Sequence, residues 1–402
     1  MASRPPFELV TTPEDFARAA AALAAGRGPF AIDTERASAF RYDDRAFLVQ
    51  VHRRGAGTFL FAPEGHREAL GEALGPVVNG TDWILHAAGE DLASLALLGL
   101  KPGSLFDTEL AARLAGFERP NLGAMVEHFT GTTLEKGHGR EDWSTTPLPD
   151  EWLVYAAEDV TYLHILAEAL AEELDARGML DAAEQEFSHI IATRSTPPAQ
   201  KTWRDVKGMS TVRTPAGLQI ARALFAERDA TARAQDISPS TVLPSRVIVE
   251  VAKAEPNHPG ELAKVHGFPA RKRGATGRWF AVIEAALRER RQAWPAPSRR
   301  ASDVPPSKSH WQRHYPESYA VLDAARGHIA EAAAELGIGA ENVLAPAVLR
   351  QVIWAAADDP VEVTAALGTD FACRRLLESG ARPWQASIAG PLIARAYSES
   401  AD

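Results

Sequence analysis

The stretch that decides the fold is Pro29-Phe30-Ala31-Ile32-Asp33-Thr34-Glu35, an apolar run that ends in two acids one position apart. Such a run predicts a buried β-strand, and side chains two positions apart in a strand point the same way. Asp33 and Glu35 are therefore expected on one face, where their charges repel. A divalent cation would remove this repulsion, and so would an exposed turn in which water screens both charges. A cation site requires further acids at ordered positions elsewhere in the chain, whereas an exposed turn does not.

Length and cysteine content limit the number of domains and the kinds of site that the chain can have. A chain of 402 residues is long enough for about two to four domains with cores of their own. Its single cysteine, Cys373, excludes an internal disulfide framework and a cysteine-based metal site. There is no apolar run of membrane-spanning length, and Met1 to Glu8 lacks the basic start and apolar core of a secretory signal. We therefore expect a cytoplasmic monomer without a membrane partner.

The charge of the chain is distributed unevenly. Its formal net charge of −10, taken as a total, argues against a nucleic-acid partner. The net charge is −16 for residues 1–193, +12 for residues 194–313 and −6 for residues 314–402. A basic segment between two acidic ones favours a phosphate-binding surface in the middle of the chain, with solvated helix faces as the alternative.

Apolar runs of strand length recur through the first part of the chain. They predict five strands, at 29–35, 46–51, 58–61, 82–88 and 104–107. Helical patterns lie before, between and after them, at 12–25, 66–74, 89–98, 108–115 and 121–130. One more helix is expected from Glu151 to about Arg177. The prediction is an α/β domain with a mixed five-stranded sheet covered by helices.

Two further acids occupy ordered positions in this domain. Asp91 lies in the first turn of the helix after the fourth strand, and Asp159 lies inside the helix that begins at Glu151. Strand ends and first helical turns meet where a mixed sheet opens, so both acids can approach Asp33 and Glu35. Carboxylates from several elements suit two Mg²⁺ or Mn²⁺ ions, and such a pair can cleave a phosphodiester.

Tyr155 precedes Asp159 by four residues, so both side chains lie on one face of the same helix. From that position the Tyr155 hydroxyl can hydrogen-bond the attacking water and orient it. His86, on the fourth strand, is either a hydrogen-bonded core histidine or a contact to the substrate.

The glycine-rich loop before the Tyr155 helix carries three side chains that can meet a phosphate: Lys136, His138 and Arg140. An ordinary exposed loop is the alternative interpretation of these three residues.

From about Ser195 the composition changes to basic and helical. Ser195-Thr-Pro-Pro198 indicates a linker, and a second linker contains Pro295 and Pro305-Pro306. Between the linkers, helices are expected at 217–229, 246–254, 259–267 and 277–292. After them, helices are expected at 318–336, 344–350 and 370–378. The basic residues are densest at Arg271-Lys272-Arg273 and from Arg288 to Arg291. We predict that the triplet 271–273 contacts nucleic-acid phosphates.

Three motifs stand in order along the first domain: Asp33-Thr34-Glu35, then Leu85-His-Ala-Ala-Gly-Glu-Asp91-Leu92, then Tyr155-Ala-Ala-Glu-Asp159-Val160. They resemble the three motifs of the DEDD 3′-to-5′ exonucleases, in the subgroup with tyrosine in the third motif. Asp142-Trp143 followed by Pro147-Leu-Pro149 makes residues 7–180 similar to the ribonuclease D family. Residues 200–292 resemble the helicase-and-RNase-D C-terminal (HRDC) domain, and 314–402 resemble a diverged second copy.

The resemblance implies an RNase H-like exonuclease domain at 1–194 and HRDC-type helical domains at 200–294 and 310–402. It implies a metal-dependent exoribonuclease that releases nucleoside 5′-monophosphates from RNA 3′ ends, as in tRNA maturation. The implied catalytic residues are Asp33, Glu35, Asp91, Tyr155 and Asp159. The four acids would bind the two metal ions, and Thr34 is counted among the substrate contacts.

Glu141 departs from the family, which tends to have a small polar residue before Asp-Trp. Its extra negative charge can weaken the approach of phosphate. Two alternatives remain open: a DNA 3′-5′ exonuclease of the repair or proofreading kind, and an inert module that only binds nucleic acid.

Overall fold

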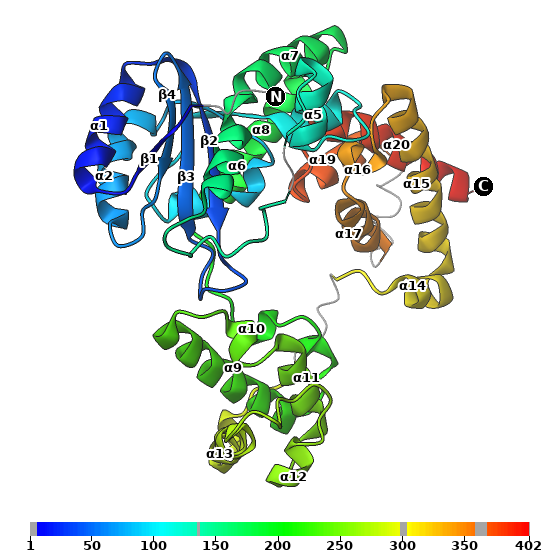
Figure 1. Cartoon of the computed structure of the whole chain (residues 1–402). Coiled ribbons are helices and arrows are strands. Elements are labelled where there is room, and N and C mark those ends of the chain that lie inside the picture. The colour runs from blue at the N-terminus through cyan, green and yellow to red at the C-terminus, as the bar shows by residue number, and fades with distance from the viewer. Residues whose placement is uncertain (1–5, 135–136, 298–303, 358–367, 402) are drawn as a thin grey trace.

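The protein is described from a computed structural model, which covers residues 6–134, 137–297, 304–357 and 368–401. Three parts follow one another along the chain, as Figure 1 shows: an α/β segment (residues 6–194), a middle helical segment (203–293) and a C-terminal helical segment (308–401). Among the described residues, no helix combines the length and the apolar character needed to cross a membrane.

A single mixed sheet forms the centre of the α/β segment. Its strands are β1 (Glu8–Val10), β2 (Arg27–Arg36), β3 (Ala46–Arg54), β4 (Gly57–Phe61), β5 (Asp82–Leu85) and β6 (Ser104–Asp107). In the order β1-β4-β3-β2-β5-β6, the pairs β2–β3 and β3–β4 are antiparallel and the others are parallel. The predicted mixed sheet is confirmed, but it has six strands instead of five. The additional strand, β1, has three residues, too few to produce an alternating pattern.

Helices cover both faces of this sheet. On one face, α1 (Pro13–Ala24) and α2 (Arg67–Val78) pack on alternate residues of β2 such as Phe30 and Ile32. On the other face, α6 (Asp150–Thr161) and α7 (Leu163–Ala176) pack on Ala31 and on β3 and β4. The remaining helices lie at the β5–β6 end: η1 (Ala88–Glu90), α3 (Leu92–Ala96), α4 (Thr108–Leu114), α5 (Leu122–Thr130) and α8 (Leu180–Arg194).

Two predicted helices differ from the structure. The helix expected from Glu151 to Arg177 is two helices, α6 and α7, that meet at Tyr162. The Thr161 hydroxyl donates to the carbonyl of Ala157, and such bonds are known to bend helices. The helix expected at 89–98 is the short η1 followed by α3, so Asp91 stands at the junction before α3 and not in a first turn.

The middle segment has a hydrophobic core of its own. Its main helices are α9 (Pro215–Gln235), α11 (Ser245–Ala254) and α13 (Ala275–Arg288), with the short α10 (Pro239–Val242) and α12 (Pro259–Leu262). Leu218, Leu224, Ile248 and Ile283 are buried at its centre. Short 3-10 turns flank these helices at Trp203–Asp205, Met209–Thr211 and Arg291–Ala293.

The C-terminal segment shares one apolar cluster with the α/β segment. Its helices are α14 (Lys308–His314), α15 (Pro316–Leu336), α16 (Ala340–Val343), α17 (Pro346–Ala357), α19 (Thr369–Glu378) and α20 (Pro383–Ala401). At the contact between the two segments, Glu186 of α8 accepts hydrogen bonds from Arg382 Nε at 2.7 Å and Trp384 Nε1 at 2.8 Å. The proposed division into three domains stays a prediction, and this shared core shows that two of the parts pack as one unit.

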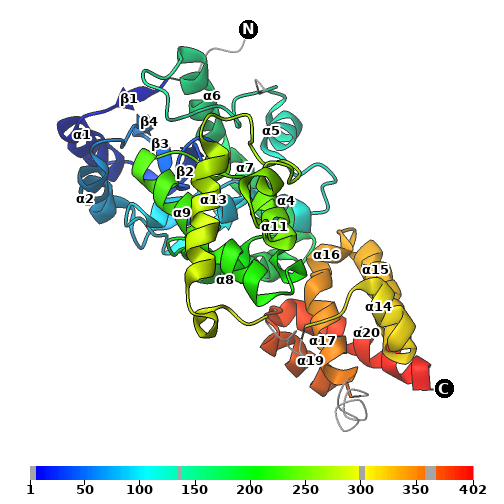
Figure 2. The same cartoon turned by 90° about the horizontal axis from the view of Figure 1, so that it is seen from below.

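The middle segment touches the α/β segment through the connection between β2 and β3. Figure 1 shows its helices as a group apart from the sheet, and Figure 2, seen from below, shows α9, α11 and α13 in front of the α/β segment. The connection, residues 37–45, reaches the end of α9. Arg45 donates to both oxygens of Asp236, at 3.0 and 2.7 Å. The Tyr42 hydroxyl donates to Asp229 at 2.8 Å, and Ser238 N donates to Phe40 O at 3.0 Å. The chain just beyond Glu35 is thus fastened to the basic segment.

Replacement of Asp236 by alanine should loosen this contact. The partly exposed pair with Arg45 is worth about 1 kcal/mol, so trypsin should cleave after Arg41 and Arg45 about fivefold faster. Asp205→Ala is the control, because within the described part of the chain Asp205 hydrogen-bonds to Thr202 alone, in its own segment. Equal cleavage rates in the two variants would show that Asp236 does not hold the segments together.

Candidate active site

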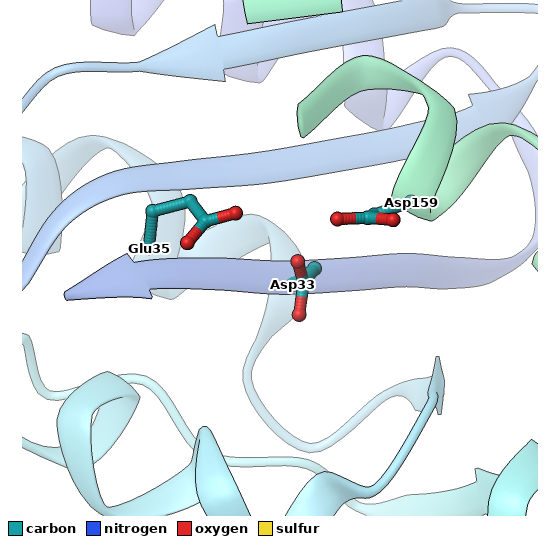
Figure 3. Close-up of side chains that lie close together, drawn as sticks. All are labelled: Asp33, Glu35 and Asp159. Carbon is teal, nitrogen blue, oxygen red and sulfur yellow. The ribbon is translucent and has the colours of Figure 1, made fainter. Parts of the chain in front are cut away.

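Strand β2 and helix α6 bring three carboxylates together. Asp33 and Glu35 project from the same face of β2, and Asp159 faces them from α6, as Figure 3 shows. One oxygen from each of the three groups lies within 4.8 Å of the other two. This is the only such group of ligand atoms among the described residues. It consists of oxygen donors alone, which hard divalent cations prefer.

Asp91 approaches the end of β2 from the opposite face of the sheet. The residue is 4% exposed, and its Oδ1 accepts a hydrogen bond from Thr34 Oγ1 at 2.6 Å. Arg36 Nη2 lies 4.0 Å from the same oxygen. Asp91 is outside the group of three, but its charge contributes to raising the pKa of Glu35 and of Asp159. All four predicted acids therefore belong to one electrostatic site.

The pKa values of these acids are raised. Burial is the largest cause for each of the four, and repulsion between neighbouring carboxylates adds to it. The charge of Asp159 further raises the pKa of the Asp33 carboxyl, and the charge of Asp33 further raises the pKa of the Glu35 carboxyl. Without a bound cation the site resists full ionisation at neutral pH. Positive charge placed among the acids would remove that resistance.

Tyr155 lies beside Asp159 on α6. The two side chains are hydrogen-bonded, and burial followed by the charge of Asp159 raises the pKa of the tyrosine hydroxyl. The hydroxyl therefore stays protonated and serves as a hydrogen-bond donor, not as a base. The Tyr155 ring packs against His138, with the ring centroids 5.7 Å apart, and against Trp143 at 6.4 Å.

The other predicted site residues lie around this centre. His138 contacts Tyr155 and Trp152, and Arg140 is exposed on the same loop. Lys136 lies outside the described residues. Arg271, Lys272 and Arg273 are exposed just before α13 in the middle segment. Their roles as substrate contacts stay predictions.

His86 and Thr34 make contacts inside the protein. His86 Nδ1 is 2.9 Å from Thr108 Oγ1, and burial lowers the pKa of the histidine to about 4. This contact agrees with the alternative of a hydrogen-bonded histidine inside the protein, and a contact from His86 to substrate stays a prediction. Thr34 is buried and orients Asp91 through its hydroxyl. That contact gives Thr34 a role in positioning an acid, and a contact from Thr34 to substrate remains a prediction.

Two residues that help to build the site were not predicted from the sequence. Arg36 is bonded to the carbonyl of Glu90 and lies 3.5 Å from Asp44, so it ties the Asp91 turn to β2. Asp107 accepts hydrogen bonds from the backbone N–H groups of Ala87 and Ala88, at 3.0 and 2.8 Å, and also caps α4. An aspartate between a short strand and a helix predicts the cap but not the bonds to residues 87 and 88.

Models of known families match all three parts of the chain. A model described as 3′-5′ exonuclease matches residues 7–175. An HRDC domain model matches residues 217–283, and one described as 3′ to 5′ exonuclease C-terminal domain matches residues 304–397. Ribonuclease D of Gluconacetobacter diazotrophicus is 30% identical over 289 residues, which are 69% of this chain and 71% of that protein. The chain belongs to the ribonuclease D family.

Further relatives and solved structures agree with this assignment. Escherichia coli ribonuclease D is 30% identical over 320 residues, covering 74% of this chain and 80% of that one. A crystal structure of E. coli RNase D, titled an exoribonuclease involved in structured RNA processing, covers 87% of this chain and 90% of that chain with a TM-score of 0.67 and 26% identity. A Bifidobacterium adolescentis protein covers 98% and 100%, with a TM-score of 0.82 and 30% identity.

The exonuclease fold and the HRDC assignment expected from the sequence are confirmed by these matches. As a member of the ribonuclease D family, the chain is a 3′-5′ exoribonuclease. The match over residues 304–397 carries the description of an exonuclease C-terminal domain. The interpretation of that region as a second HRDC copy stays a prediction.

The raised pKa values of the acids predict how stability depends on pH without metal. The native protein keeps protons that the unfolded chain releases above about pH 4, so its free energy of unfolding should fall as pH rises from 5 to 8. Thermal unfolding in EDTA measures this slope. Asp159→Asn should flatten it, whereas Glu118→Gln, at an exposed position, should not. An unchanged slope in Asp159→Asn would contradict the electrostatic account.

Proposed function

We propose that Asp33, Glu35, Asp91 and Asp159 hold two divalent cations, Mg²⁺ or Mn²⁺, and that Tyr155 completes the catalytic site. The observation that carries this proposal is the convergence of three carboxylates within 4.8 Å, with the buried Asp91 close enough to raise the pKa of two of them. Their mutual repulsion is a structural cost that bound cations offset.

The donor set fits such ions. The ligand atoms of the three-acid group are all carboxylate oxygens, and no cysteine or histidine belongs to the group within the described part of the chain. Zinc sites, by contrast, are built mainly from sulfur and imidazole nitrogen. When bound, the cations supply an activated water and neutralise the charge that develops at the scissile phosphate.

The protein's own residues then position the reactants. The Tyr155 hydroxyl donates its one proton to Asp159, and its oxygen can accept a hydrogen bond from the attacking water and hold that water in line with the phosphodiester. Thr34 and Arg36 keep Asp91 oriented toward the site. The aromatic rings of His138 and Trp152 lie beside Tyr155 and offer a surface on which the terminal base can stack.

The substrate in this proposal is the 3′ end of an RNA, released as nucleoside 5′-monophosphates during maturation of tRNA or other stable RNA. Support comes from E. coli RNase D, whose crystal structure is described as that of an exoribonuclease involved in structured RNA processing. The acidic α/β segment provides little attraction for a polyanion, so we assign backbone binding to the basic middle segment and to Arg271, Lys272 and Arg273. A monomeric state and a cytoplasmic setting complete the proposal.

Tyr155→Phe tests the catalytic assignment. Loss of the hydroxyl should lower kcat on a 3′ end-extended single-stranded RNA about 100-fold, while Tyr162→Phe, at the junction of α6 and α7, should leave kcat unchanged. Excess EDTA should abolish cleavage by every variant. Gel analysis of a 5′-labelled strand, run beside DNA of the same sequence, separates the alternatives. RNA shortened one nucleotide at a time supports the proposal.

Several outcomes of that assay would contradict the proposal. Cleavage that persists in EDTA would exclude the metal mechanism. Equal shortening of DNA would favour the repair or proofreading exonuclease, and retardation of RNA without shortening would favour the inert binding module.

Salt dependence tests the role of the basic triplet. Each phosphate contact to a single strand contributes about 0.7 to the slope of log affinity against log salt, so alanine at all three positions should reduce that slope by about 2. Binding of RNA by an inactive Asp159→Asn background, measured by fluorescence anisotropy, gives the slope. The control removes three exposed cations of the α/β segment: Arg27, Lys101 and Arg119. Equal losses in the two triple variants would contradict a specific role for residues 271–273.

A further inference from the structure

A buried glutamine in β3 has no hydrogen-bond partner. Gln50 is 0% exposed, and neither its Oε1 nor its Nε2 bonds to any of the described residues. An unpaired amide in an apolar interior costs about 1 to 3 kcal/mol. The neighbours of Gln50 along β3, Val49 and Val51, are apolar and fully buried. Packing alone would be served better by an apolar side chain, so the amide requires another explanation.

The other buried glutamines of the described chain are satisfied. Gln219 Nε2 donates to Ala286 O at 2.9 Å, and its Oε1 accepts from Arg222 at 2.6 Å. Gln385 Nε2 donates to Asn342 O at 2.9 Å. Among the described buried glutamines, Gln50 is therefore the exception, because its side-chain amide has no hydrogen-bond partner.

The position of Gln50 provides the explanation. In the antiparallel pairing of β2 with β3, Gln50 stands directly opposite Asp33, so the two side chains emerge on the same face of the sheet. Their Cβ atoms are expected about 5 Å apart in such a pair. Helix α6, which carries Tyr155 and Asp159, covers this face over both strands. The free amide thus lies at the wall of the acidic site.

The acids differ in the side chains that donate hydrogen bonds to their carboxylates. Asp91 is held by Thr34 and approached by Arg36, and Asp159 is held by the Tyr155 hydroxyl. Asp33, which lies between Glu35 and Asp159 in Figure 3, has a backbone hydrogen bond from Thr34 but no side-chain donor among the described residues. A neutral N–H donor can orient a carboxylate without competing with a cation for the site, which an arginine or lysine would do.

We propose that Gln50 is a positioning residue of the metal site, whose Nε2 donates to the Asp33 carboxylate and fixes its orientation toward the cations. This inference rests on the proposed two-metal function. The unpaired amide is then a group held ready for the loaded site. Its cost to stability is offset when Nε2 donates to the Asp33 carboxylate in its ligand geometry.

The test compares two substitutions of one kind in the full-length protein. Gln50→Met keeps the length and volume of the side chain and removes the amide, and Gln219→Met does the same to an amide with partners. Thermal unfolding in EDTA and calorimetric titration with Mn²⁺ are measured for both. Gln50→Met should unfold at the same or a higher temperature than the wild type and bind Mn²⁺ about 10-fold more weakly. Gln219→Met should unfold at a lower temperature and bind Mn²⁺ as the wild type does.

Two results would overturn the inference. Wild-type Mn²⁺ affinity in Gln50→Met would show that the amide has no part in the site. A loss of stability in EDTA as large as that of Gln219→Met, or failure to fold, would show that the amide is a structural group. If the wild type and Gln219→Met bind no Mn²⁺, the proposed function itself fails, and that outcome is distinct from a defect confined to Gln50→Met.

Discussion

Repulsion between carboxylates that β2 and α6 hold within 4.8 Å is the constraint on which the rest of this structure depends. Two acids separated by one residue on a strand cannot move apart, because β2 is paired with β3 at both positions, Asp33 opposite Gln50 and Glu35 opposite Leu48. Helix α6 cannot retreat either, since its apolar residues fill the core over β3 and β4. The fold therefore maintains a concentration of negative charge that bound cations can relieve.

The surrounding contacts keep this arrangement in place. Asp107 fixes the turn after β5 through two backbone N–H groups, and this turn presents Asp91 to Thr34. Arg36, at the end of β2, contacts the same turn through the carbonyl of Glu90 and the carboxylate of Asp91. Beyond Arg36, the connection to β3 is bonded to Asp236 of the middle segment. A path of short contacts thus links the basic helices that we assign to RNA backbone binding with the strand that carries the acids.

Much of this architecture follows from local sequence. The apolar run that ends at Asp33 and Glu35 predicted β2, and four-residue spacing placed Tyr155 and Asp159 on one helical face. Other features depend on contacts between distant segments, which no local pattern contains. Arg36, Asp107 and Gln50 have ordinary sequence surroundings, and their roles become visible only when β3, β2, β5 and β6 are assembled into one sheet. The three-residue β1 and the break at Tyr162 are too short for periodicity to detect.

The central claim is that the four acids bind a pair of cations at one place. Crystals of the full-length protein soaked with Mn²⁺ test it through the anomalous scattering of the metal. The account predicts two peaks about 4 Å apart, in contact with Asp33, Glu35, Asp91 and Asp159. Absence of any peak among these carboxylates at millimolar Mn²⁺, or peaks only elsewhere on the surface, would contradict it.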